Sequence, residues 1–90
     1  MTFRVEFYYL ESKTKEVVDE WTTEGFRYPD LTAMDYMDCR DCELNKGEEV
    51  IVTLFRDGEA RSSILWYEKD GEQNYSVIFE RSEGGIEEML

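Results

Sequence analysis

The sequence predicts an α+β domain: an antiparallel sheet made of an N-terminal β-hairpin and a C-terminal three-stranded meander, with one short helix or irregular acidic segment between them. Three observations predict it. Residues 2–11 alternate between apolar and polar, residues 48–81 hold three strand-like runs separated by two Asp-Gly pairs, and a short helix-like pattern follows the only proline, Pro29. Alternation is typical of strands, and Asp-Gly between alternating runs indicates a hairpin.

The N-terminal hairpin is expected from two runs separated by the polar hexad ESKTKE. The first run places its apolar residues on one side: Phe3, Val5, Phe7 and Tyr9. The second run, EVVDEWTTE, is rich in residues that favour a pleated surface, and as a strand it groups Val17 with Trp21 and Thr23 on one face. A helix through Val17, Val18 and Trp21 is the competing interpretation.

The segment after Pro29 predicts a short helix. Asp30 or Thr32 can cap its N-terminus, and an apolar stripe follows at a spacing of three residues: Leu31, Met34 and Met37. At 100° per residue, Asp38 and Asp41 fall inside this stripe. The helix is therefore expected to be shallow and partly exposed.

The meander over residues 48–81 contains the runs EVIVTLF, RSSILWYEK and NYSVIFER. Both faces of these strands carry apolar residues, so the inward face is open at this point. One assignment turns the following residues inward: Val50, Val52, Leu54, Ile64, Trp66, Tyr75, Val77 and Phe79. We expect residues 1–83 to form a single compact domain and residues 84–90 to be a flexible acidic tail.

Charge excludes several functions. The 90 residues include 10 basic and 22 acidic side chains, a net charge of −12 at pH 7. Such a chain is repelled by nucleic acid and by anionic membranes, so we expect no direct binding to either. It is attracted to basic partners, and proteins that bind phosphate backbones are the largest class of these. The alternative to a basic partner is that the acidic residues serve only to keep the protein soluble.

The cellular location is expected to be the cytoplasm, or the host cytoplasm if the protein is viral. Residues 1–10 alternate and do not form the charged start and apolar run of a secretion signal, and no window reaches the roughly 18 apolar residues that span a bilayer. Two cysteines do not make the disulfide framework of a small secreted domain, which agrees with a reducing compartment.

Catalysis is not expected. The chain has no histidine, so it lacks the commonest general base and the commonest zinc ligand. Neither a P-loop nor a dinucleotide-binding glycine motif is present. Carboxylate pairs are abundant, but a domain of this size rarely holds the deep cleft that a glycosidase needs. We therefore expect a protein that is not an enzyme and uses no cofactor.

Cys39 and Cys42 form the C-x-x-C of the stretch DYMDCRDCE. Two thiolates at this spacing could hold a metal, but zinc needs four ligands and no second pair exists in the chain. A metal shared across a dimer would supply the missing ligands. Acidic neighbours raise the cost of a thiolate, which disfavours a redox pair. The simplest interpretation is that both are small, half-buried residues.

The acidic segment itself is the strongest functional candidate. Residues 30–49 hold seven acidic residues against Arg40 and Lys46, a net charge of −5. Carboxylates stand about 5 to 6 Å apart along a helix face, and about 6.6 Å apart along a strand face, close to the separation of successive phosphates. The predicted partner-binding residues are Asp35, Tyr36, Asp38, Asp41, Glu43, Glu48 and Glu49.

In size, acidity, lack of histidine and β content, the chain resembles phage-encoded inhibitors that occupy nucleic-acid channels, such as anti-CRISPR proteins and DNA-mimic inhibitors of glycosylases or restriction enzymes. The resemblance is one of class and rests on no motif. It implies stoichiometric, non-catalytic inhibition of a host defence or DNA/RNA-processing protein through its basic surface, by a monomer or homodimer. Alternatives are a small acidic interaction module that binds a basic partner without mimicry, and a dimer linked by metal at Cys39 and Cys42.

Overall fold

The computed structural model describes residues 1–25 and 30–81, so the predicted tail at residues 84–90 lies outside the described part. It contains five strands and one helix: β1 (Thr2–Tyr9), β2 (Thr14–Thr22), α1 (Ala33–Asp38), β3 (Glu49–Arg56), β4 (Glu59–Lys69) and β5 (Glu72–Glu80). The predicted α+β architecture of hairpin, short helix and meander is confirmed.

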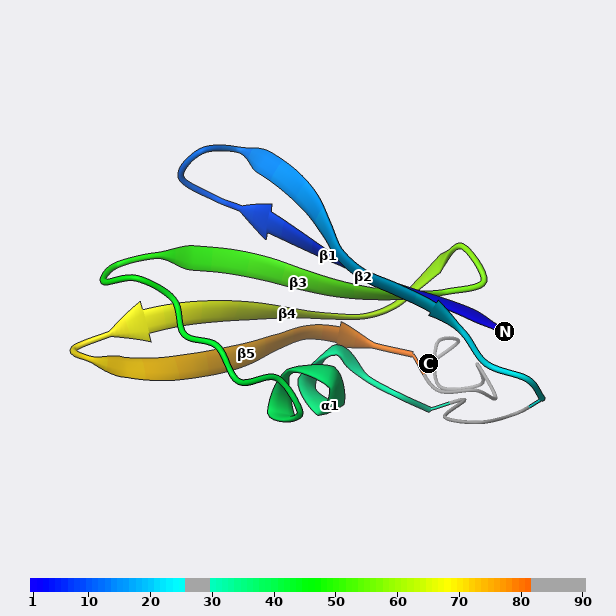
Figure 1. Cartoon of the computed structure of the whole chain (residues 1–90). Coiled ribbons are helices and arrows are strands. Elements are labelled where there is room, and N and C mark those ends of the chain that lie inside the picture. Colours follow the sequence, from blue (N-terminus) through cyan, green and yellow to red (C-terminus); the bar gives the residue numbers. More distant parts are fainter. Residues whose placement is uncertain (26–29, 82–90) are drawn as a thin grey trace.

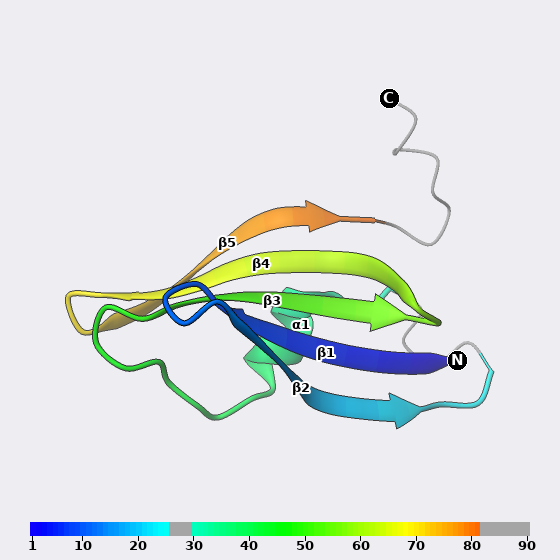
Figure 2. The same ribbon diagram turned by 90° about the horizontal axis from the view of Figure 1, so that it is seen from above.

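The strands form one antiparallel sheet in the order β2-β1-β3-β4-β5. Because β1 also pairs with β3, the N-terminal hairpin and the meander share one sheet, with β2 and β5 at its edges. Helix α1 lies against one face of this sheet (Figures 1 and 2). We call the opposite face the outer face.

The turns of the meander have the backbone that its Asp-Gly pairs predict. Asp57 and Gly58 have φ values of 50° and 84°, and Asp70 and Gly71 have φ values of 54° and 82°. Two successive positive φ angles define the type I′ turn, whose twist matches that of the flanking strands. Aspartate and glycine tolerate this left-handed backbone better than most residues.

The core lies between α1 and the sheet. Its buried members are Phe3, Val5, Phe7, Ala33, Met37, Val50, Val52, Leu54, Ile64 and Trp66. These residues come from α1 and from the strands β1, β3 and β4. They confirm the inward faces predicted for the three strands. Three ring pairs extend the core toward both edges, since Phe3 stacks on Trp21, Phe7 packs edge-on against Trp66, and Trp66 stacks on Tyr75.

Strand β2 differs from the prediction because it contains a bulge. Val5 pairs with Asp19, whereas the next residue of β1 pairs with Val17, so Val18 is an extra residue. A bulge interrupts the alternation of side chains. Val17 is therefore 53% exposed, while Val18 and Trp21 pack against the core. The predicted grouping of Val17 with Trp21 is wrong, and so is the alternative of a helix.

Strand β5 also departs from its predicted face. Val77 points toward the side that carries α1 but is 53% exposed, because α1 packs against β3 and β4 and leaves this edge strand uncovered. A second bulge pairs Phe79 with Ser63 on the outer face. Of the three residues predicted to turn inward on β5, only Tyr75 packs against the core.

Candidate functional site

Helix α1 starts with a capping box that uses one of the predicted site residues. The Thr32 hydroxyl accepts a hydrogen bond from the Asp35 backbone N–H at 3.0 Å, and the Asp35 carboxylate accepts one from the Thr32 N–H at 3.3 Å. This pair satisfies amide groups that a helix start leaves without partners. Thr32 is one of the two caps expected from the sequence. Asp35 remains exposed and fixed in place.

Tyr36 anchors the helix to strand β2. Its ring stacks on Trp21 with centroids 5.9 Å apart, and its hydroxyl donates to the Asp19 carboxylate at 3.0 Å. Burial, followed by the hydrogen bond to Asp19, raises the pKa of Tyr36 above its ordinary value. Tyr36 is thus half-buried and mainly positions the acidic residues around it.

Arg40 turns inward, away from the carboxylates that surround it in sequence. Its Nη1 donates to the Tyr36 hydroxyl at 2.9 Å, its Nε donates to Cys42 Sγ at 3.2 Å, and its guanidinium carbon lies 5.0 Å from the centroid of the Phe7 ring. Arginine is suited to such combined hydrogen bonding and stacking. The cation therefore ties this segment to the sheet, and it forms no ion pair with an acidic residue in the described part of the chain.

The three central acids of the segment point into solvent. Asp38, Asp41 and Glu43 are exposed, and within the described part of the chain their side chains make no hydrogen bond and no ion pair. Burial raises the pKa of Tyr75 on β5, and the charge of the Asp38 carboxylate raises it further. Their charges are therefore available to a partner.

The loop from residue 39 to residue 48 has no helix or strand, yet Gln73 of β5 holds it firmly. The Gln73 side-chain oxygen accepts from the Leu44 backbone N–H at 2.9 Å and from Trp66 Nε1 at 2.8 Å. Its amide nitrogen donates to the Leu44 carbonyl at 3.4 Å. One side chain thus joins the acidic loop to the core tryptophan.

Glu68 of β4 fixes the end of the same loop. Its carboxylate accepts from the backbone N–H groups of Gly47 at 2.7 Å and Gly71 at 2.6 Å. These two bonds stabilise the ionised form and lower the pKa of Glu68. An open groove of about 480 Å³ lies here, lined by Glu43, Leu44, Lys46, Glu68, Asp70, Gly71 and Gln73.

The last two predicted site residues lie on opposite faces of the sheet. Glu48 is near Tyr9, and its carboxylate accepts from the Asn45 N–H at 3.0 Å to close a turn. Glu49 pairs with Tyr67 on the outer face. The structure therefore brings Asp35, Asp38, Asp41, Glu43 and Glu48 to the face that carries α1. Glu49 lies on the outer face, although it borders one groove together with Glu48.

Two further carboxylates on this face were not predicted. Glu16 accepts from the Tyr9 hydroxyl at 3.2 Å, and Asp19 accepts from Tyr36. The sequence shows that Glu16 and Asp19 are three residues apart, which would place them on opposite faces of a regular strand. The bulge that turns both toward α1 cannot be read from the sequence. Asp19 borders a groove of about 240 Å³ whose other lining residues are Trp21, Leu31, Asp35, Tyr36 and Cys39. We define the acidic face by Glu16, Asp19, Asp35, Asp38, Asp41, Glu43 and Glu48.

The two cysteines are both unoxidised thiols. Cys39 is exposed. Cys42 is half-buried against the core, and its Sγ accepts a hydrogen bond from Arg40. In residues 1–25 and 30–81, no group of three or more Cys, Asp or Glu side chains is arranged to hold a metal ion. A site shared between two chains would need its remaining ligands from the second chain.

Comparisons with protein-family models, with curated protein sequences and with solved structures give no match to this chain. Among the helices described, none is long and apolar enough to cross a membrane. Function is therefore inferred from the side chains and their arrangement.

Proposed function

We propose that this protein is a stoichiometric, non-catalytic inhibitor that binds the basic nucleic-acid-binding surface of another protein through its acidic face. One observation carries the proposal. Asp38, Asp41 and Glu43 are exposed and have no partner among residues 1–25 and 30–81, while Arg40, the cation between them in sequence, is turned into the molecule. Unpaired carboxylates held this way offer a basic groove the kind of charge that a phosphate backbone offers.

Rigidity supports the same proposal. The acidic loop is tied down by Gln73 and Glu68, and the helix before it is fixed by Tyr36. Binding costs less when the contact residues are already ordered, because fewer side chains and backbone torsions have to be immobilised. The acidic face should therefore associate quickly with a basic surface under electrostatic steering.

The partner class follows from the sign of the charge. With a net charge of −12, the protein should not bind duplex or single-stranded nucleic acid itself. A protein that holds nucleic acid presents a complementary basic surface. We further propose that the protein is phage-encoded, that its target is a host defence or DNA/RNA-processing protein, and that it acts in the host cytoplasm.

The test is capture followed by displacement. The immobilised protein is incubated with cell lysate at low and high salt, the retained proteins are identified, and a purified retained protein is loaded with labelled nucleic acid. We expect release of the label at a one-to-one ratio. A partner that binds at the acidic face while keeping its nucleic acid would instead favour an acidic interaction module without mimicry.

A further inference from the structure

The outer face of the sheet is apolar and uncovered. Strand alternation and the pairing registers place seven large apolar side chains on it: Tyr8, Val17, Ile51, Phe55, Leu65, Tyr67 and Phe79. Tyr8, Ile51 and Leu65 lie directly opposite one another and form a continuous row across β1, β3 and β4. Helix α1 lies on the opposite face of the sheet and does not cover this row (Figures 1 and 2).

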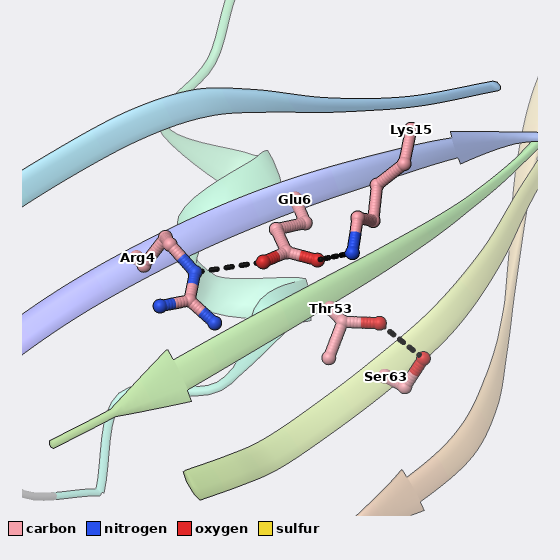
Figure 3. Close-up of polar contacts among 5 residues, drawn as sticks. All are labelled: Arg4, Glu6, Lys15, Thr53 and Ser63. Atoms are coloured by element: carbon pink, nitrogen blue, oxygen red, sulfur yellow. Dashed lines mark hydrogen bonds and ion pairs between the residues drawn. The ribbon is translucent and has the colours of Figure 1, made fainter. Parts of the chain in front are cut away.

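The charged groups at the centre of the outer face are already paired. Glu6 is only 9% exposed, and its carboxylate oxygens lie 2.7 Å from Arg4 Nε and 3.7 Å from Lys15 Nζ (Figure 3). The Arg4 guanidinium carbon lies 4.3 Å from the centroid of the Phe55 ring. Paired charges can be covered by a second layer at much lower cost than a lone charge.

The polar row beside Glu6 is also satisfied. Thr53 and Ser63 face each other across β3 and β4, with their hydroxyls 3.1 Å apart (Figure 3). Ser63 is buried, although it lies on the uncovered side of the sheet. If a second layer covered this row, both hydroxyls would therefore keep a hydrogen bond.

Charge is divided unequally between the outer face and the rest of the molecule. By strand register, the outer face carries three cations (Arg4, Lys15, Lys69) and four carboxylates (Glu6, Glu20, Glu49, Glu72), a net charge of −1. The remaining described residues carry six cations and fifteen carboxylates, a net charge of −9. The outer face is thus the one broad surface among the described residues where another strongly acidic molecule meets little repulsion.

We infer that a second copy of this chain packs on the outer face, sheet against sheet, to form a homodimer. A six-residue helix covers only part of one side of the five-stranded sheet, whereas stable domains bury apolar faces between two packed layers. A basic partner would be attracted to the acidic face, so charge favours a like copy here. The dimer holds both acidic faces outward and forms whether or not those faces bind a basic protein.

Sedimentation equilibrium of the full chain tests this inference. The parent should be a dimer in the micromolar concentration range, and Leu65→Glu should weaken the dimer by about 100-fold or more, because a lone carboxylate would be buried between apolar side chains. Val77→Glu is the matched control, since Val77 is an exposed valine on the opposite side of the sheet. It should leave the dimer unchanged.

The dependence on salt distinguishes association through the outer face from binding through the acidic face. Added salt should strengthen the dimer, because it screens repulsion between two acidic chains, whereas it should weaken binding of a basic partner. If Leu65→Glu loses its circular dichroism spectrum, Tyr67→Glu, nearer the end of the same face, takes its place. A parent that stays monomeric up to about 1 mM at both salt concentrations overturns the inference. A dimer that Val77→Glu breaks and Leu65→Glu does not break also overturns the inference.

Discussion

Single side chains hold the acidic segment in place, and most of them are not acidic. Gln73 makes three hydrogen bonds, two to the backbone of Leu44 and one to Trp66. Arg40 contacts Tyr36, Cys42 and Phe7. Neither residue stands out in the sequence, because a lone glutamine on a strand and a lone arginine in an acidic stretch are normally solvated. Their roles depend on neighbours that only the fold brings together.

Replacing Gln73 tests whether the acidic loop depends on β5. Gln73→Leu removes the acceptor for Leu44 N–H and Trp66 Nε1, and should lower the free energy of unfolding by about 1 to 3 kcal/mol. Gln73→Glu keeps that acceptor, so its free energy of unfolding should fall clearly less than that of Gln73→Leu. Urea unfolding followed by tryptophan fluorescence measures both. Equal losses for the two variants would show that the shared oxygen contributes nothing.

Replacing both cysteines tests the metal alternative. Cys39 is exposed and Cys42 accepts one hydrogen bond, which a serine hydroxyl can also accept. Cys39→Ser/Cys42→Ser should therefore melt within a few degrees of the parent, a cost of about 1 kcal/mol or less. Zinc bound in stoichiometric amounts by the parent, or unfolding of the parent by a chelator, would support a metal-linked dimer instead.

At the scale of elements, the sequence predicted the strands, the hairpins and the site of the helix, because alternation, Asp-Gly pairs and a capping residue are local signals. It failed at the bulges in β2 and β5, where one extra residue changes which of the following side chains point toward α1. It also placed Glu49 with the other site acids, although Glu48 and Glu49 point to opposite faces once β3 begins.

Helix α1 is too short to be stable alone, so its cap should matter. Isolated helices of fewer than about 12 residues are marginal in water. Thr32→Ala removes the hydroxyl that accepts from Asp35 N–H and should cost about 1 kcal/mol of unfolding free energy, whereas Thr32→Ser should cost little. Thermal melts of the three proteins measure the difference. Equal melting temperatures would mean that packing of Ala33 and Met37 alone fixes the helix.

At the scale of the whole molecule, the sheet separates two surfaces of different character. One carries α1 and the acidic face, where carboxylates are exposed and Arg40 is turned inward. The other is nearly neutral, with apolar rows and a paired Glu6 at its centre. Net charge alone does not reveal this division, because it depends on which strand positions point to which side. We propose a basic partner for the first surface and a second copy of the chain for the second.

The central claim is that Asp38, Asp41 and Glu43 form the contact surface for a basic nucleic-acid-binding protein. The most direct measurement titrates the captured partner with the parent, with a variant in which these three residues are changed to Lys, and with a matched control. The control changes Glu24, Glu59 and Glu80 to Lys, which alters net charge equally at exposed positions near the other end of the sheet. Each titration is run at low and high salt.

The site variant should lose affinity by about 100-fold or more at low salt and keep its fold, because exposed carboxylates contribute little to stability. The control should bind within a few-fold of the parent, and added salt should narrow the difference between the two variants. Equal losses for both variants would show that only net charge matters. A site variant that binds as tightly as the parent would contradict the central claim and place the contact surface elsewhere.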